Sequence, residues 1–196
     1  MGNIHVPPLG RVADALISFC GLVEYVETGT FLGDSLHWAS SRFRQVTTVE
    51  FREDFLRQAR ERTAHISNIR YVLGDSGVAL GHIVPDLSGP TLFWLDAHAG
   101  AGFFGDKDVC PLLSELKAVM SSPLGHCLII DDARAFLAPP PPPFDYTKWP
   151  TLEQVMAMLL LKSNVHVVVI EDAIIAVPSG ARPLLAKLCA EIRPAI

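Results

Sequence analysis

The 196-residue chain is long enough for one domain with a substantial core and is cramped for two. Its composition, 49% hydrophobic and 19% charged residues, is typical of a folded globular protein and excludes a disordered one. The formal net charge of −5 provides no basic excess for nucleic acid, so we expect no nucleic acid among the partners.

Strand-like and helix-like segments alternate along the first half of the chain, as in a parallel sheet with helices on its faces. The segments between the strands have the spacing of amphipathic helices. Ser35 is a residue type that favours the N-cap of a helix. The predicted strands are 22–27, 45–51 and 69–76, and the predicted helices are 35–43, 52–66 and 76–83.

The second half continues this alternation up to a C-terminal hairpin. The segment 91–100 is almost wholly apolar until Asp96, which predicts a central strand that is buried on both faces. Thr151 with Gln154 resembles a capping box at the start of a helix. The other predicted elements are helices at 111–120, 152–163 and 182–192, a strand at 126–134 and an antiparallel hairpin at 165–180.

Five consecutive prolines at 139–143 interrupt regular structure, because proline fits neither a helix interior nor a sheet interior. We interpret the run as a stiff surface connection, and a docking ligand for a partner is the other interpretation. The sequence has no internal repeat and no domain boundary. It therefore predicts one domain over 1–196, with a proline-rich loop insertion at 138–150 and a Gly/Asp loop at 101–108.

The cysteines and the apolar runs bear on the cellular compartment. The four cysteines lie far apart without a CxxC pair, which fits reduced thiols in a cytosol. The longest apolar runs fall far short of the roughly 20 residues that span a membrane. The N-terminal segment has no basic region followed by an apolar one. We expect a cytoplasmic protein with no membrane partner.

Acidic residues stand at the ends of five successive predicted strands. One such residue would be an ordinary strand terminator, but the repetition predicts an acidic rim at the carboxyl edge of the sheet, where ligands of open α/β folds bind. Such a rim suits a ligand rich in hydroxyl and amino donors, or a cation, and it repels phosphates. No GxxxxGK[ST] sequence is present. The residues are Glu27, Glu50, Asp75, Asp96 and the pair Asp131 and Asp132.

Four short motifs, in this order and spacing, resemble those of the class I S-adenosylmethionine-dependent methyltransferases. "VETGTFLGDS" (26–35) looks like motif I, with Phe31 in place of the middle glycine. "TTVEF" (47–51), "YVLGDS" (71–76) and "FWLDAH" (93–98) resemble the three motifs that follow. The resemblance covers roughly residues 20 to 180. It implies an α/β fold: a single Rossmann-like, doubly wound sheet, mostly parallel, with an antiparallel strand from the C-terminal hairpin.

The resemblance also implies a site for S-adenosylmethionine. The glycines of motif I would let the backbone pass under the methionyl part, with Glu27 as the acidic anchor of the turn. Glu50 would accept hydrogen bonds from both ribose hydroxyls. Asp75 would accept from the adenine amino group, with Ser76 beside it. The full set of implied cofactor-binding residues is Glu27, Gly29, Thr30, Gly33, Ser35, Glu50, Asp75, Ser76 and Asp96.

Within this superfamily, Asp96 followed by Asp131 and Asp132 is similar to the metal triad of magnesium-dependent O-methyltransferases, of the catechol type and of the macrocin or mycinamicin sugar type. The resemblance therefore implies Mg²⁺, which prefers oxygen ligands. His98 stands where the sugar enzymes carry a general base, so Asp96 and His98 are the predicted catalytic residues. An ordinary loop histidine and a solvated turn carboxylate are the alternatives. Arg134 is placed either to pair with the acidic cluster or to bind an anionic substrate.

The leading hypothesis is an S-adenosylmethionine-dependent methyltransferase that methylates a hydroxyl of a small-molecule acceptor with Mg²⁺. The alternative is a cofactor-binding or interaction module that has kept the fold and lost the chemistry. A hydroxylase on a similar scaffold would need a histidine-rich iron triad, and Asp96 with His98 falls short of one. Trp94 is expected in the core, whereas Trp149 and Tyr146 are candidates to line a substrate mouth. A homo-oligomer that shares a lid between subunits is compatible with the short N-terminal segment.

Overall fold

The computed structural model describes residues 3–98, 109–138, 140–142 and 145–192. The loop predicted at 101–108 and part of the proline run, 139 and 143, lie outside the described residues. The strands are β1 (Glu24–Thr28), β2 (Gln45–Glu50), β3 (Ile69–Leu73), β4 (Thr91–Leu95), β5 (Cys127–Ile130), β6 (Val165–Ile170) and β7 (Ala173–Pro178). The helices are α1 (Leu9–Cys20), α2 (Asp34–Ser40), α3 (Glu53–Arg62), α4 (Ser76–Ile83), α5 (Leu112–Ser121), α6 (Arg134–Leu137), α7 (Leu152–Leu159) and α8 (Arg182–Ile192). Short 3-10 turns occur at Val84–Asp86, Tyr146–Lys148 and Ser179–Ala181.

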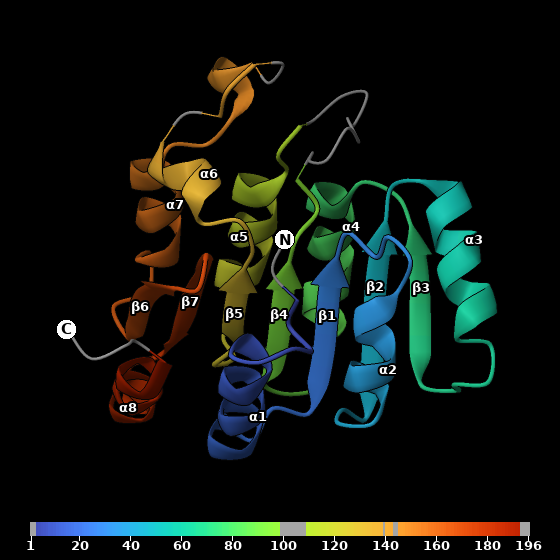
Figure 1. The fold of residues 1–196 in the computed structure, drawn as a ribbon, viewed down its shortest axis with the longest axis horizontal. Coiled ribbons are helices and arrows are strands. Elements are labelled where there is room, and N and C mark those ends of the chain that lie inside the picture. Colours follow the sequence, from blue (N-terminus) through green and yellow to red (C-terminus); the bar gives the residue numbers. More distant parts are fainter. Residues whose placement is uncertain (1–2, 99–108, 139, 143–144, 193–196) are drawn as a thin grey trace.

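The strands form one seven-stranded sheet in the order β3-β2-β1-β4-β5-β7-β6. The first five strands pair in parallel, and β7 runs antiparallel between β5 and β6. This confirms the predicted fold class, including the antiparallel C-terminal hairpin. The chain moves outward from β1 to β3 and then returns to place β4 on the other side of β1 (Figure 1). The carboxyl ends of β1 and β4 therefore flank the switch point of the sheet, the usual ligand site of such folds.

Helices cover both faces of the sheet, because alternate strand residues point to opposite sides. Tyr25 and Trp94 belong to the core between the sheet and the layer of α1, α2, α3 and α8. Val26 and Phe93 belong to the core on the other face, with α4, α5, α6 and α7 (Figure 1). All five residues of β4 are buried, as the sequence predicted for a central strand. Among the described residues, no helix combines the length and the apolar character that crossing a bilayer requires.

Three local differences from the predicted elements have clear causes. Helix α1 was not predicted, although Leu9, Val12, Ala13 and Leu16 have helical spacing and all are buried. The prediction of Ser35 as an N-cap was wrong: Gly33 caps α2 in the left-handed conformation, and the Ser35 side chain is used elsewhere. The predicted strand 126–134 stops at Ile130, because Asp132 adopts a positive φ of 52°.

Candidate active site at the carboxyl edge of the sheet

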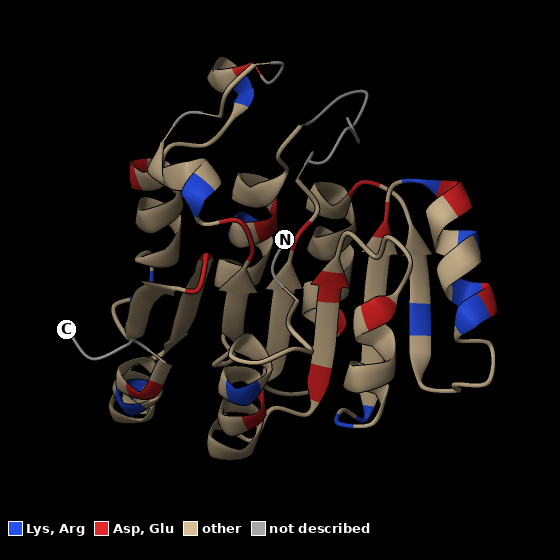
Figure 2. Ribbon diagram, in the orientation of Figure 1, with Lys and Arg blue, Asp and Glu red and all other residues tan. Residues whose placement is uncertain are grey.

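Acidic side chains gather along the carboxyl edge of the sheet, as the sequence predicted. Figure 2 shows red segments at the ends of neighbouring strands and most blue segments on helices. Because β1 to β5 are parallel, residues that follow each strand meet at one edge.

The turn after β1 has a backbone path that only glycine allows at two positions. Gly29 has a φ of 82°, and a Cβ atom there would lie 2.2 Å from the carbonyl oxygen of Asp96. Gly33 has a φ of 74°, and its Cβ would crowd Leu36 and Ala59. Phe31, at the position of the missing glycine, also has a positive φ of 47°. The glycines thus let this turn pass directly over the end of β4 and close onto α2 and α3.

Glu27 is the buried anchor of that turn. Its carboxylate accepts hydrogen bonds from Tyr25 Oη (2.9 Å), Thr48 Oγ1 (2.8 Å) and Ser35 Oγ. The pKa of Glu27 is raised, because the effect of burial outweighs the three hydrogen bonds, which lower it. Thr30 bonds to the Thr48 hydroxyl in turn. Glu27, Thr30 and Ser35 therefore tie the turn to β2 and α2, and their polar atoms point into the protein.

Glu50 is held at the end of β2 by two backbone amides. Its Oε2 accepts from Phe31 N and its Oε1 from Arg52 N, both at 2.9 Å. The Phe31 ring packs against Phe55 with centroids 4.8 Å apart, next to this carboxylate. Each carboxylate oxygen has two lone pairs, so Glu50 can still accept hydrogen bonds from a diol.

Asp75 and Ser76 form the start of α4 at the end of β3. Asp75 is the N-cap residue, and its Oδ1 accepts from Val78 N at 3.3 Å. Ser76 is 5% exposed and lies beside Glu115 of α5. The carboxylate of Asp75 thus lies at the same edge as Glu50, one strand further from the switch point.

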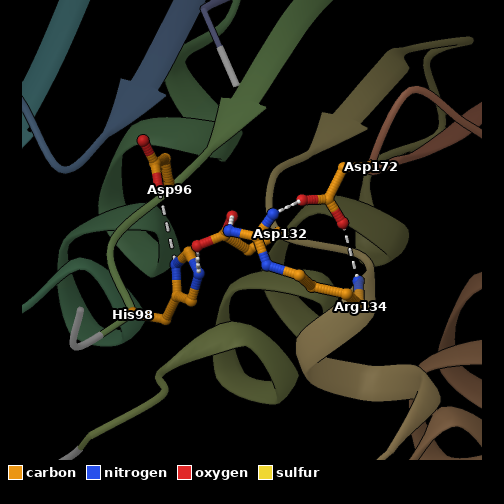
Figure 3. Close-up of polar contacts among 5 residues, drawn as sticks. All are labelled: Asp96, His98, Asp132, Arg134 and Asp172. Carbon is orange, nitrogen blue, oxygen red and sulfur yellow. Dashed lines mark hydrogen bonds and ion pairs between the residues drawn. The ribbon is translucent and has the colours of Figure 1, made fainter. Parts of the chain in front are cut away.

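His98 lies between two carboxylates (Figure 3). Its Nε2 is 3.1 Å from Asp132 Oδ2, and its Nδ1 is 3.4 Å from Asp96 Oδ1. Burial opposes a charge on the ring, but the hydrogen bond to Asp132 and the neighbouring carboxylates outweigh it and raise the pKa of His98. The same hydrogen bond is the main reason why the pKa of Asp132 is lowered. Burial, opposed by the His98 charge, raises the pKa of Asp96 well above its usual range.

The residues predicted to bind Mg²⁺ do not form a metal site in this arrangement. Within the described ranges, no three His, Cys, Asp or Glu side chains are placed to hold one metal ion. His98 takes the place between Asp96 and Asp132, and Arg134 pairs with Asp132 at 2.8 Å. Repulsion from Asp131 and Asp132 contributes to the raised pKa of Asp96. A protonated imidazole can reduce that repulsion as a cation would.

Two aromatic rings border His98. The Trp149 ring lies 5.7 Å from the His98 ring and 6.1 Å from Phe136, measured between centroids. Trp149 was predicted as a mouth residue, and it is 6% exposed beside the histidine. Tyr146, the other candidate, is 65% exposed.

Glu115 is a buried acid near this site that the sequence analysis missed. It is 1% exposed on α5, and burial raises its pKa to about 7, with Ser76, Thr28 and His98 as the neighbours that lower it. A signal was present, because Glu115 shares a helical face with Leu112, Leu116 and Val119.

Comparisons with known proteins come from structure alone, since no protein-family model and no curated protein sequence matches the chain. A provisionally assigned methyltransferase from Streptococcus mutans, in complex with S-adenosylhomocysteine (SAH), superimposes with a TM-score of 0.59 at 15% identity. The match covers 88% of this chain and 98% of that one. A provisionally assigned caffeoyl-CoA O-methyltransferase from Staphylococcus aureus gives 0.58 at 16% identity, over 88% and 84% of the two chains. An rRNA methylase from Streptococcus thermophilus gives 0.54 at 12% identity, over 88% and 97%. At these identities the likeness shows the fold alone: the chain shares the architecture of class I methyltransferases.

Proposed function

We propose that this chain is an S-adenosylmethionine-dependent methyltransferase that acts on a hydroxyl of a small-molecule acceptor. The observation that carries the proposal is the position of His98, whose ring lies between Asp96 and Asp132 beside the switch point of the sheet. Ligands of open α/β folds bind at that point. A histidine that is oriented there by a carboxylate has the arrangement of a general base.

The ends of β1, β2 and β3 would hold the cofactor. The Glu50 carboxylate, which keeps lone pairs beyond those used by the two backbone amides, fits a ligand that carries a diol. Asp75 would accept from an amino group one strand further along. When bound, S-adenosylmethionine supplies a methyl group on a positively charged sulfur, which an acidic rim tolerates. The other proposed cofactor-binding residues are Thr30, Gly33 and Ser76. Glu27 and Ser35 support the turn after β1.

His98 would take the proton of the acceptor hydroxyl at Nδ1. If Nε2 carries the proton that is donated to Asp132, the neutral ring has its lone pair on Nδ1, which faces Asp96. The Nδ1 atom of His98 is 3.4 Å from Asp96 Oδ1, and the side chains are 8% and 31% exposed, so Asp96 would turn aside to let the hydroxyl reach Nδ1. The imidazolium form cannot accept a proton. His98 must therefore lose its own proton before it acts as the base.

A small-molecule acceptor fits the surface charge better than a nucleic acid does. The chain carries a net charge of −5, and Asp and Glu residues stand at the strand ends along the edge where the acceptor would bind (Figure 2). Carboxylates repel a phosphate backbone. The action on rRNA belongs to the protein from Streptococcus thermophilus and is no part of this proposal.

Mg²⁺ bound by Asp96, Asp131 and Asp132 is the part of the sequence-based hypothesis that the described geometry does not fit. A metal ion would have to displace His98 from between the carboxylates and compete with Arg134 for Asp132. We assign no step to a metal. A magnesium titration followed by histidine NMR tests this assignment, because displacement of His98 would shift its ring signals.

Calorimetric titration with SAH is the first test of the proposal, and one site is expected. Transfer of a radiolabelled methyl group from S-adenosylmethionine to a panel of catechols and sugars is the second. His98→Gln should keep the affinity for SAH and slow transfer by roughly 10²–10⁴-fold. Binding of SAH without transfer to any acceptor would favour the alternative of a non-catalytic module. Binding of NAD in place of SAH would show that the proposal is wrong.

A further inference from the structure

We propose that Arg134 and Asp172 are a positioning pair that holds Asp132 against His98, an inference that rests on the proposed function of His98 as the base. The turn between β6 and β7 would then control the geometry of the reactive site from outside it. Figure 3 shows the five side chains in one continuous series, from Asp96 through His98, Asp132 and Arg134 to Asp172.

Arg134 contacts both neighbouring aspartates at once. One terminal nitrogen, Nη2, donates to Asp132 Oδ1 at 2.8 Å, while Nη1 donates to Asp172 Oδ2. Asp132 uses its other oxygen, Oδ2, for His98. The planar guanidinium suits this double contact, because its donors have a fixed fork geometry that lysine lacks.

Asp172 also holds the backbone at the start of α6. Its carbonyl oxygen accepts from Ala133 N at 2.8 Å, and its Oδ1 accepts from Arg134 N at 2.9 Å. The segment that carries Asp132 is therefore attached to the hairpin through main chain and side chain together. Three bonds to one residue leave the backbone beside Asp132 little freedom to turn.

The turn between β6 and β7 has a defined backbone conformation. Glu171 and Asp172 both have positive φ, 51° and 62°, as in a two-residue type I′ turn between the paired residues Ile170 and Ala173. Asp132 needs such support, because it has a φ of 52° in a short connection and its side chain is 20% exposed. A carboxylate in that setting would otherwise choose among several rotamers.

The alternative is that Arg134 and Asp172 form a surface ion pair with no effect on the site. The Arg134 side chain is 63% exposed, and exposed pairs often contribute little to stability. The two possibilities differ in what happens at His98, so a measurement at the histidine separates them.

The test uses the full chain labelled with ¹⁵N-histidine and follows the Nε2–H proton of His98, assigned by its loss in His98→Gln. Asp172→Asn removes the charge that Arg134 contacts, while asparagine still accepts at Oδ1 and tolerates the positive φ. Glu171→Asn is the matched control, since it makes the same change of charge at the neighbouring turn position. Arg134→Met tests the pair without touching the turn, and thermal unfolding reports whether each variant is folded.

We expect the Nε2–H proton to exchange with solvent at least about tenfold faster in Asp172→Asn and Arg134→Met, and at the wild-type rate in Glu171→Asn. Wild-type exchange in both Asp172→Asn and Arg134→Met would overturn the proposal, as would an equal effect in Glu171→Asn. If Asp172→Asn does not fold, Arg134→Met decides alone. SAH titration of the wild-type protein tests the methyltransferase proposal separately, because the exchange measurement needs no cofactor.

Discussion

The backbone of Gly29 lies directly over that of Asp96: a Cβ atom on Gly29 would be 2.2 Å from the Asp96 carbonyl oxygen. Close by, Asp96 N donates to the carbonyl of Thr28 at 3.1 Å. The turn that would receive the cofactor therefore packs, backbone against backbone, on the strand end that carries Asp96. A change in either segment moves the other.

Gly29→Ala should accordingly destabilise the fold and weaken SAH binding together. The left-handed backbone and the clash with Asp96 should lower the free energy of unfolding by about 2–4 kcal/mol. Gly81→Ala is the matched control, because no atom lies within 4 Å of its Cβ position on the exposed side of α4. Urea unfolding of both variants measures the effect. Equal stabilities would show that the Gly29 turn can relax.

Glu50→Ala should weaken SAH binding by on the order of 2–4 kcal/mol, because it removes the proposed ribose contacts and leaves the amides of Phe31 and Arg52 without their acceptor. Glu53→Ala removes an exposed glutamate three residues away and should bind SAH normally. Calorimetry of the two folded variants gives the comparison. Unchanged affinity in Glu50→Ala would remove Glu50 from the cofactor site.

His98 should make stability and activity respond to pH in opposite directions. Its folded pKa is raised, so the stabilisation by the paired imidazolium is fully present below the unfolded pKa of about 6.5 and is lost as the pH rises through the folded value. Methyl transfer should rise over the same range, since the base must be neutral. Unfolding titrations of wild type, His98→Gln and the exposed control His82→Gln measure the first effect. A wild-type slope in His98→Gln would contradict it.

Glu115 should make the protein less stable as the pH rises from its ordinary pKa of 4.5 to about 7. The folded state retains the proton over this range and the unfolded state releases it, which favours unfolding. Glu115→Gln removes this penalty, so it should gain up to about 3 kcal/mol over wild type at pH 8 and little at pH 4. Glu61→Gln, exposed on α3, is the control. A gain that is the same at both pH values would assign the effect to packing instead of ionisation.

Much of the fold and of the site could be predicted from the sequence, because the patterns that indicate them lie within short segments. The acidic residues at 27, 50, 75 and 96 each end an apolar run, and parallel strands bring such ends to one edge. Helix α1 shows that a signal can be present and overlooked, since its apolar spacing is as regular as that of the predicted helices. Glu115 is a second case, a carboxyl on the apolar face of a predicted helix.

By itself, the sequence determined the alternation of strands and helices, the central position of β4 and the carboxyl edge on which the acids lie, because periodicity and strand ends are properties of short segments. Only the tertiary structure decided what those acids contact. Ser35 turns inward to Glu27 instead of capping α2, and His98 lies between Asp96 and Asp132, where the sequence predicted a metal ion. Arg134 reaches Asp172 across 38 positions. The direction of a side chain depends on which distant segments meet at its position, and that information is absent from the pattern around it.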